Sequence, residues 1–254
     1  MANLEQIKIL NQQYGKRSPF VNYNVRENLS EAFDPDKIEK AFQDSIANLG
    51  PEYSMYFDFG VDADVALLFI DVCEFSMRFG DLTGDEIGEY FDEYYDKIIP
   101  IIYKYGGEVD KIIGDGIICV FGPPFQNETL EFNINKANLC AKEIIIATIK
   151  TKFASKVAFH CGSVNYFKNK TGLYQEYTII GKPLTELFRL ESISVDNRIN
   201  YYDDTKIRSF YKDRFSNDPD NVSSQKILWT HYGKVITTLK GVQFDQFFSI
   251  NYNG

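Results

Sequence analysis

Short apolar runs of strand length alternate along this chain with longer stretches whose apolar residues recur at helical spacing. The run from Val65 to Asp71 predicts a strand, and apolar residues spaced about one helical turn apart from near Asp85 to Ile102 predict a long helix. Two further runs, Glu108 to Ile113 and Ile117 to Phe121, are joined by a short glycine-rich turn. This pattern predicts a β-hairpin.

The rest of the chain continues the alternation of helices and strands. The pattern predicts a helix at about Glu128 to Lys150, strands at Lys156 to Cys161 and Leu173 to Ile180, a helix at about Pro183 to Ser192, a strand at Arg198 to Tyr202, a short helix within residues 203–225, and a closing pair near Ile227 to Leu239 and Phe244 to Ile250. This order is typical of an α+β domain with a mainly antiparallel sheet and helices on one face, the ferredoxin-like architecture.

The pattern divides the chain into an N-terminal helical flank, residues 1–61, and a catalytic-sized domain, residues 62–254. The flank begins polar and contains one stretch with helical periodicity, Pro35 to Asn48, which Asp34 would cap. We find no internal repeat and no low-complexity tract, which excludes solenoid architectures.

Composition narrows the class of protein. A formal net charge of −9 argues against nucleic acid polymers and anionic membranes as partners, because both attract a basic surface. No secretory signal is visible and no apolar stretch approaches the roughly 18 residues of a membrane span, so a cytoplasmic protein is expected. The four cysteines lack CxxC spacing and the chain has two histidines, which indicates reduced thiols and no structural zinc.

Two aspartates stand at the ends of predicted strands. Asp71 follows an apolar run, and Asp115 lies between Gly114 and Gly116 at the hairpin tip, where glycines permit a positive φ. A carboxylate fixed beside apolar side chains is costly unless a cation partners it. Two such carboxylates brought together predict a divalent metal site.

The sequence around each aspartate resembles a known metal-binding signature. The stretches LLFIDVCEFS (Leu67 to Ser76) and YGGEVDKIIGDGIICVFGPP (Tyr105 to Pro124) are similar to those of the class III nucleotidyl cyclases, the family of adenylyl and guanylyl cyclase catalytic domains. The resemblance covers roughly residues 62–250. It implies that metal ions, two Mg²⁺ or Mn²⁺ per active site, are held by Asp71, Val72 and Asp115, and that a phosphate-holding turn is formed by Phe75 and Ser76.

The resemblance also implies cations for the triphosphate. Arg189 stands where the family has an arginine one helical turn after an asparagine, and Thr185 replaces that asparagine. Lys240 precedes a glycine as in the family's lysine-glycine hairpin. A second departure is Glu74, which stands where glycine is usual in the phosphate-holding turn.

The resemblance implies that Lys111 and Thr178 recognise the base, with Tyr177 beside them. A lysine can donate to uracil O4, whereas Thr178 lacks the strong acceptor that an adenine amine needs and offers guanine only one hydroxyl. Unpaired groups of this kind cost roughly 1 to 3 kcal/mol. The pair favours a pyrimidine, and UTP over CTP, because cytosine has an amine in place of O4. In this the chain resembles the pyrimidine cyclases of bacterial Pycsar antiphage systems, which make cUMP or cCMP for a separate effector.

The family pattern implies a head-to-tail homodimer whose active sites are composite. Asp71 and Asp115 would come from one chain and the base and phosphate residues from the other. CTP, a purine triphosphate, and nucleotide binding without turnover stay open as alternatives. Gly106-Gly107-Glu108 superficially matches a diguanylate cyclase signature, but the following residues do not continue it. His160 is interpreted as a structural residue and not as a base.

Overall fold

The structure is a computed structural model, and it describes residues 51–57, 59–80, 82–168, 177–203, 205–214, 222–223, 226–235 and 239–254. The helix expected at Pro35 to Asn48 and most of the predicted flank lie outside these residues. Within the described ranges, no helix is both long and apolar enough to cross a membrane.

One eight-stranded sheet organises the described residues, in the order β2-β3-β1-β4-β6-β10-β9 with β5 paired to β4. Its strands are β1 (Ala63–Val72), β2 (Glu108–Ile113), β3 (Gly116–Phe121), β4 (Ser155–Lys168), β5 (Tyr177–Ile180), β6 (Arg198–Tyr202), β9 (Trp229–Val235) and β10 (Gln246–Tyr252). β4 and β6 pair in parallel and the other neighbours are antiparallel. The prediction of a mainly antiparallel sheet is therefore confirmed. A separate pair joins β7 (Val222–Ser223) and β8 (Lys226–Ile227).

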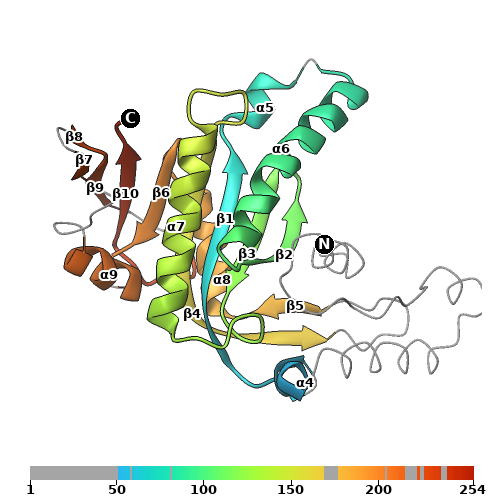
Figure 1. Cartoon of the computed structure of the whole chain (residues 1–254), viewed down its shortest axis with the longest axis vertical. Helices are drawn as coiled ribbons and strands as arrows, with labels where there is room; N and C mark the ends of the chain where they lie inside the picture. The colour runs from blue at the N-terminus through green and yellow to red at the C-terminus, as the bar shows by residue number, and fades with distance from the viewer. Residues whose placement is uncertain are drawn as a thin grey trace, which may run out of the picture.

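Helices cover both faces of this sheet. They are α4 (Pro51–Phe57), α5 (Phe75–Arg78), α6 (Gly84–Lys104), α7 (Leu130–Thr148), α8 (Lys182–Glu191) and α9 (Lys206–Arg214). Figure 1 shows α6 and α7 in front of the sheet and α8 behind it. α6 begins with a capping box in which Thr83 and Glu86 bond each other's backbone N–H groups, as the polar start of this helix favours.

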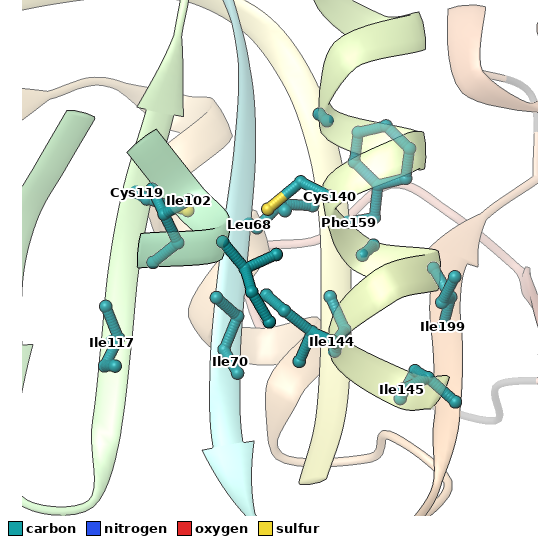
Figure 2. Packing of buried hydrophobic residues seen from close by; sticks show 14 of the residues in the cluster. Leu68, Ile70, Ile102, Ile117, Cys119, Cys140, Ile144, Ile145, Phe159 and Ile199 are labelled. Atoms are coloured by element: carbon teal, nitrogen blue, oxygen red, sulfur yellow. The ribbon is translucent and has the colours of Figure 1, made fainter. Parts of the chain in front are cut away.

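The core under α6 and α7 is built from alternate residues of the central strands. Leu68 and Ile70 of β1 pack with Ile102 of α6 and Ile144 of α7, and all four are fully buried. Figure 2 shows these side chains filling the layer between sheet and helices.

The opposite face of β1 is equally buried. Leu67 and Phe69 point to the other side of the strand and pack with Leu184, Leu187 and Leu190 of α8. The prediction of helices on one face only was therefore wrong. The physical reason is that apolar residues at consecutive positions of β1 require cover on both faces.

Most element boundaries agree with the sequence pattern. β4 continues to Lys168, beyond the Cys161 at which its strand was predicted to end. The short helices α4 and α5 were not predicted. Of the strand expected from Leu173 to Ile180, the structure describes Tyr177–Ile180, and the preceding residues lie outside the described ranges.

Candidate active site

The sheet brings Asp71 and Asp115 together. β3 pairs with both β1 and β2, so the end of β1 lies beside the tip of the β2–β3 hairpin that carries Asp115. Gly114, the first residue of that turn, has a φ of 60°, as type II′ turns need. A Cβ at Gly116 would overlap the ring of Phe69 and lie 3.3 Å from Asp71 Oδ1. The glycine is thus required mainly by the close approach of the Phe69 ring, with Asp71 Oδ1 as a further tight neighbour.

The two carboxyl groups influence each other's protonation. Burial raises the pKa of Asp71 and the neighbouring Asp115 carboxylate raises it further, to about 7. Burial also raises the pKa of Asp115, although hydrogen bonds, one of them with Asp71, oppose the effect. A pair of carboxylates in this setting needs a proton or a cation to neutralise it.

Two further charged residues complete this cluster, and neither was predicted from the sequence. Lys156 is the cross-strand partner of Asp71 on β4, and its Nζ lies 3.3 Å from Asp71 Oδ2. The same Nζ lies 2.8 Å from Oε1 of Glu191, the last residue of α8. The only sequence signal for Lys156 is that it lies four residues before His160 in β4. Residues an even number apart in a strand point to the same face, so both side chains lie on the α8 face.

Tyr95 of α6 supports the hairpin tip. Its hydroxyl donates to the backbone oxygen of Gly114 at 3.1 Å. Burial and then the Asp115 carboxylate raise the pKa of Tyr95 to about 12, so the hydroxyl stays protonated and able to donate. The position of Asp115 therefore depends on α6 as well as on the turn.

The two carboxylates suit a divalent ion whose remaining ligands are water or substrate oxygens. In the part of the chain that the structure describes, no group of three or more His, Cys, Asp or Glu side chains could hold a metal ion alone. Mg²⁺ is commonly held by one or two carboxylates together with substrate phosphates. Asp71 and Asp115 fit that mode, and Val72, predicted to join them, is the last residue of β1.

A second group of candidate residues gathers where β2 faces β5. The Lys111 ammonium donates to the Thr178 hydroxyl and lies 3.2 Å from Oδ2 of Asp110. The side chain of Lys111 is 13% exposed and that of Asp110 is 7% exposed. A register shift in β2 at Asp110 marks a bulge. Tyr177 begins β5, and its side chain lies outside the described part.

The third group lies on α8, on the side that faces away from the sheet. Thr185 and Arg189 are both exposed, one helical turn apart. Glu186, on the buried side, forms a 3.0 Å hydrogen bond with His160 Nε2, and its backbone oxygen accepts from the Tyr202 hydroxyl. These buried contacts fix the rotation of α8, and they agree with a structural interpretation of His160.

Lys240 is exposed in a turn that is tied to α8. Gly241 follows it with a φ of 81°. Gln243 accepts a hydrogen bond of 3.0 Å from Lys182, and the ring of Phe244 stacks on Tyr202 at 4.5 Å. The turn and α8 thus form one supported surface.

Phe75 and Ser76, predicted to contact phosphate, belong to α5. The ring of Phe75 packs against Phe79 and Phe91, with centroids 4.8 and 5.2 Å away, at the edge of the core under α6. The side chain of Ser76 lies outside the described residues. Glu74, just before α5, has a φ of 56°, in the left-handed region that favours glycine.

No hydrogen bond or ion pair between described residues links the Asp71 cluster to Lys111 or Thr178. The structure therefore brings the predicted residues together as separate groups: the two aspartates, the Lys111 pair, and the surface of α8 with the Lys240 turn.

Comparison with known proteins identifies the fold. No protein-family model and no curated protein sequence matches this chain. Among solved structures, the guanylate cyclase domain of RhGC from Catenaria anguillulae, in complex with GTP, is 16% identical over 76% of this chain and 100% of that chain, with a TM-score of 0.60. The adenylyl cyclase CyaB from P. aeruginosa is 18% identical over 76% and 96%, with a TM-score of 0.58. The guanylyl cyclase Cya2 is 18% identical over 77% and 94%, with the same score. The described chain therefore has the mixed α+β fold of adenylyl and guanylyl cyclase catalytic domains.

Proposed function

We propose that this protein is a nucleotide cyclase that converts UTP to cUMP and pyrophosphate. The observation that carries the proposal is the convergence of Asp71 and Asp115 at adjoining strand ends. The raised pKa of Asp71, caused by burial and by Asp115, indicates a site that needs a cation. The fold is one in which known proteins perform nucleotide cyclisation.

In the proposed reaction the ribose 3′-oxygen attacks the α-phosphorus, the bond from that phosphorus to the bridging oxygen breaks, and pyrophosphate leaves. The proton of the 3′-hydroxyl passes to a substrate phosphate or to water. Mg²⁺ or Mn²⁺, two per site and held by Asp71, Asp115 and the Val72 backbone, would neutralise charge on the attacking and leaving oxygens. Arg189 and Lys240 bind the triphosphate.

Thr185 and the turn before α5 have positioning roles in this proposal. The Thr185 hydroxyl lies one helical turn before Arg189 on the exposed side of α8, and it donates to a phosphate or ribose oxygen. The backbone at Phe75 and Ser76 holds the phosphates, while the Phe75 ring anchors that turn in the core.

Selectivity for uracil is assigned to the contact between Lys111 and Thr178. Because the Thr178 oxygen already accepts from Lys111, it is a poor acceptor for the amine of adenine or cytosine. The Lys111 ammonium retains protons to donate to uracil O4, and the Thr178 hydroxyl, which donates to the Ile179 backbone oxygen at 3.5 Å, would turn to O4 when the base binds. Tyr177 neighbours this pair and is proposed to fill space left by the smaller base.

We further propose a head-to-tail homodimer with two composite sites, each with the aspartates of one chain and the Lys111, Thr178, Arg189 and Lys240 of its partner. The exposure of Arg189 and Lys240, which leaves both side chains accessible to a second chain, supports the proposal. Mixing Asp71→Ala with Arg189→Ala protein, each inactive alone, is expected to restore activity through one intact site per mixed dimer. No recovery in a confirmed mixed dimer would count against shared sites.

The product is proposed to be a second messenger in bacterial antiphage defence, made in the cytoplasm and read by a separate effector. This part rests on the resemblance to pyrimidine cyclases.

The test is to incubate the protein with each of UTP, CTP, ATP and GTP and Mn²⁺, and to identify products by mass. The expected product is cUMP, lost in Asp71→Asn protein. cCMP as the main product would shift the proposal to CTP. Only cAMP or cGMP would overturn the pyrimidine assignment, and no product from any triphosphate would favour a domain that binds nucleotide without turnover.

A further inference from the structure

Lys156 lies between carboxylates that belong to different elements of the fold. Its Nζ is 2.8 Å from Glu191 Oε1 on α8 and 3.3 Å from Asp71 Oδ2 on β1. The Lys156 and Glu191 side chains are each 19% exposed and Asp71 is 15% exposed, so water screens these contacts only in part. The sheet fixes the arrangement, since Lys156 is the direct cross-strand partner of Asp71.

The charges of this cluster leave room for a divalent ion. When ionised, Asp71, Asp115 and Glu191 carry three negative charges, and Lys156 supplies one positive charge. Before substrate binds, the remaining charge of two negatives would be balanced by the first divalent cation.

Lys156 and a metal ion would compete for the same carboxylate. The ammonium is a compact point charge on a flexible stem. Because both carboxylates lie within reach of Nζ at once, Lys156 can release Asp71 by a small rotation and keep its bond to Glu191. Without Glu191, the same movement would leave a partly buried ammonium with no partner, which is unfavourable.

We propose that Lys156 is a positioning residue that neutralises Asp71 in the metal-free protein and withdraws onto Glu191 when a divalent ion binds. Lys156 thereby sets the affinity of the site for metal, and Glu191 determines how readily Lys156 withdraws. The inference rests on the proposed function in one respect, that a divalent ion binds at Asp71 and Asp115.

The test measures Mn²⁺ binding without nucleotide, by the electron paramagnetic resonance signal of free Mn²⁺. Lys156→Met keeps most of the stem and removes the charge. It is expected to bind Mn²⁺ about tenfold more tightly than the parent, a difference of about 1.4 kcal/mol. Lys156→Gln, measured in parallel, is expected to shift in the same direction. The matched control is Lys152→Met, which removes an exposed lysine paired with Glu93 and should leave Mn²⁺ affinity unchanged.

If Lys156 served only to support the strand, both Lys156 variants would bind Mn²⁺ as weakly as the parent or more weakly. That result would overturn the proposal.

Glu191→Gln provides the second arm. It is expected to weaken Mn²⁺ binding about tenfold in the parent, and by less than about threefold when combined with Lys156→Met. Equal factors in both backgrounds would mean that Glu191 acts through its own charge alone and not through Lys156, which would overturn the proposal.

The assay separates this inference from the cyclase proposal. The parent protein should lower the signal of free Mn²⁺ by binding it, and Asp71→Asn is expected to abolish this decrease. A parent protein with no Asp71-dependent binding would overturn the role of Lys156. Formation of a cyclic product is measured separately. A protein that binds Mn²⁺ as described but makes no cyclic nucleotide would overturn the cyclase function and leave the role of Lys156 intact.

Discussion

Replacing Asp71 by asparagine is expected to stabilise the metal-free fold at neutral pH. The side chain of Asp71 is 15% exposed, and its carboxyl group lies beside the Asp115 carboxylate. Ionising it in the folded protein is therefore harder than in the unfolded chain. Asparagine removes that charge and keeps the size and shape of the side chain.

The magnitude follows from the pKa of Asp71, which burial and then Asp115 raise from 3.8 to about 7. The folded protein holds this proton more tightly than the unfolded chain, so the free energy of unfolding falls as pH rises between about 4 and about 7. At about 1.4 kcal/mol per pH unit, the ionised carboxyl lowers the free energy of unfolding by about 4 kcal/mol above that range. Asp71→Asn is expected to recover up to this amount.

Urea denaturation in the presence of a chelator, across about pH 4 to 8, measures the effect. The parent should lose stability as pH rises, whereas Asp71→Asn should lose clearly less. Adding Mn²⁺ should restore the parent and leave Asp71→Asn unchanged. Asp64→Asn is the matched control, because Asp64 is an exposed residue of the same strand. A parent whose stability stays flat or rises across the range, or an Asp71→Asn protein no more stable than the parent at neutral pH, would refute the reasoning.

Other perturbations test single features of the site. Glu74→Gly is expected to raise the free energy of unfolding by about 1 kcal/mol, because the left-handed backbone of Glu74 suits glycine; Glu74→Ala should bring no gain in the same urea titration. Tyr95→Phe removes the hydrogen bond to the hairpin turn and should lower the free energy of unfolding by roughly 0.5 to 1.5 kcal/mol. It should also lower kcat by a larger factor than it raises KM. An intact kcat would show that the turn holds Asp115 unaided. Thr178→Asp supplies an acceptor for a base amine and should raise the ratio of kcat/KM for CTP over UTP about tenfold; an unchanged ratio would place base selection elsewhere.

The fold was largely predictable because its central strands have strong local signals. The apolar run of β1 and the glycine-flanked hairpin located Asp71 and Asp115 and put them at adjoining strand ends. The side on which α8 packs was not predicted, although the sequence contains a signal for it. Val65 to Ile70 are apolar without interruption, and such a strand needs cover on both faces.

The charged neighbours of the site were harder to predict. Lys156 is the second residue of β4, near a strand end where a lysine is most often solvated, and no local pattern distinguishes it. Its two partners come from β1 and from the end of α8. A contact between elements so far apart in sequence depends on strand register and helix packing, which hydrophobic periodicity does not specify.

The register also explains why these groups share one face of the sheet. Alternate residues of a strand point to opposite faces, so Phe69 and Asp71 of β1 and Lys156 and His160 of β4 all lie on the α8 side. Along that face, His160 binds Glu186 in the middle of α8, and Lys156 binds Glu191 at the end of the same helix. Both contacts fix the helix whose exposed side carries Thr185 and Arg189. A change in the charge state around Asp71 is therefore coupled to α8 through Glu191. Metal binding at Asp71 can thus affect the position of the proposed phosphate residues on α8.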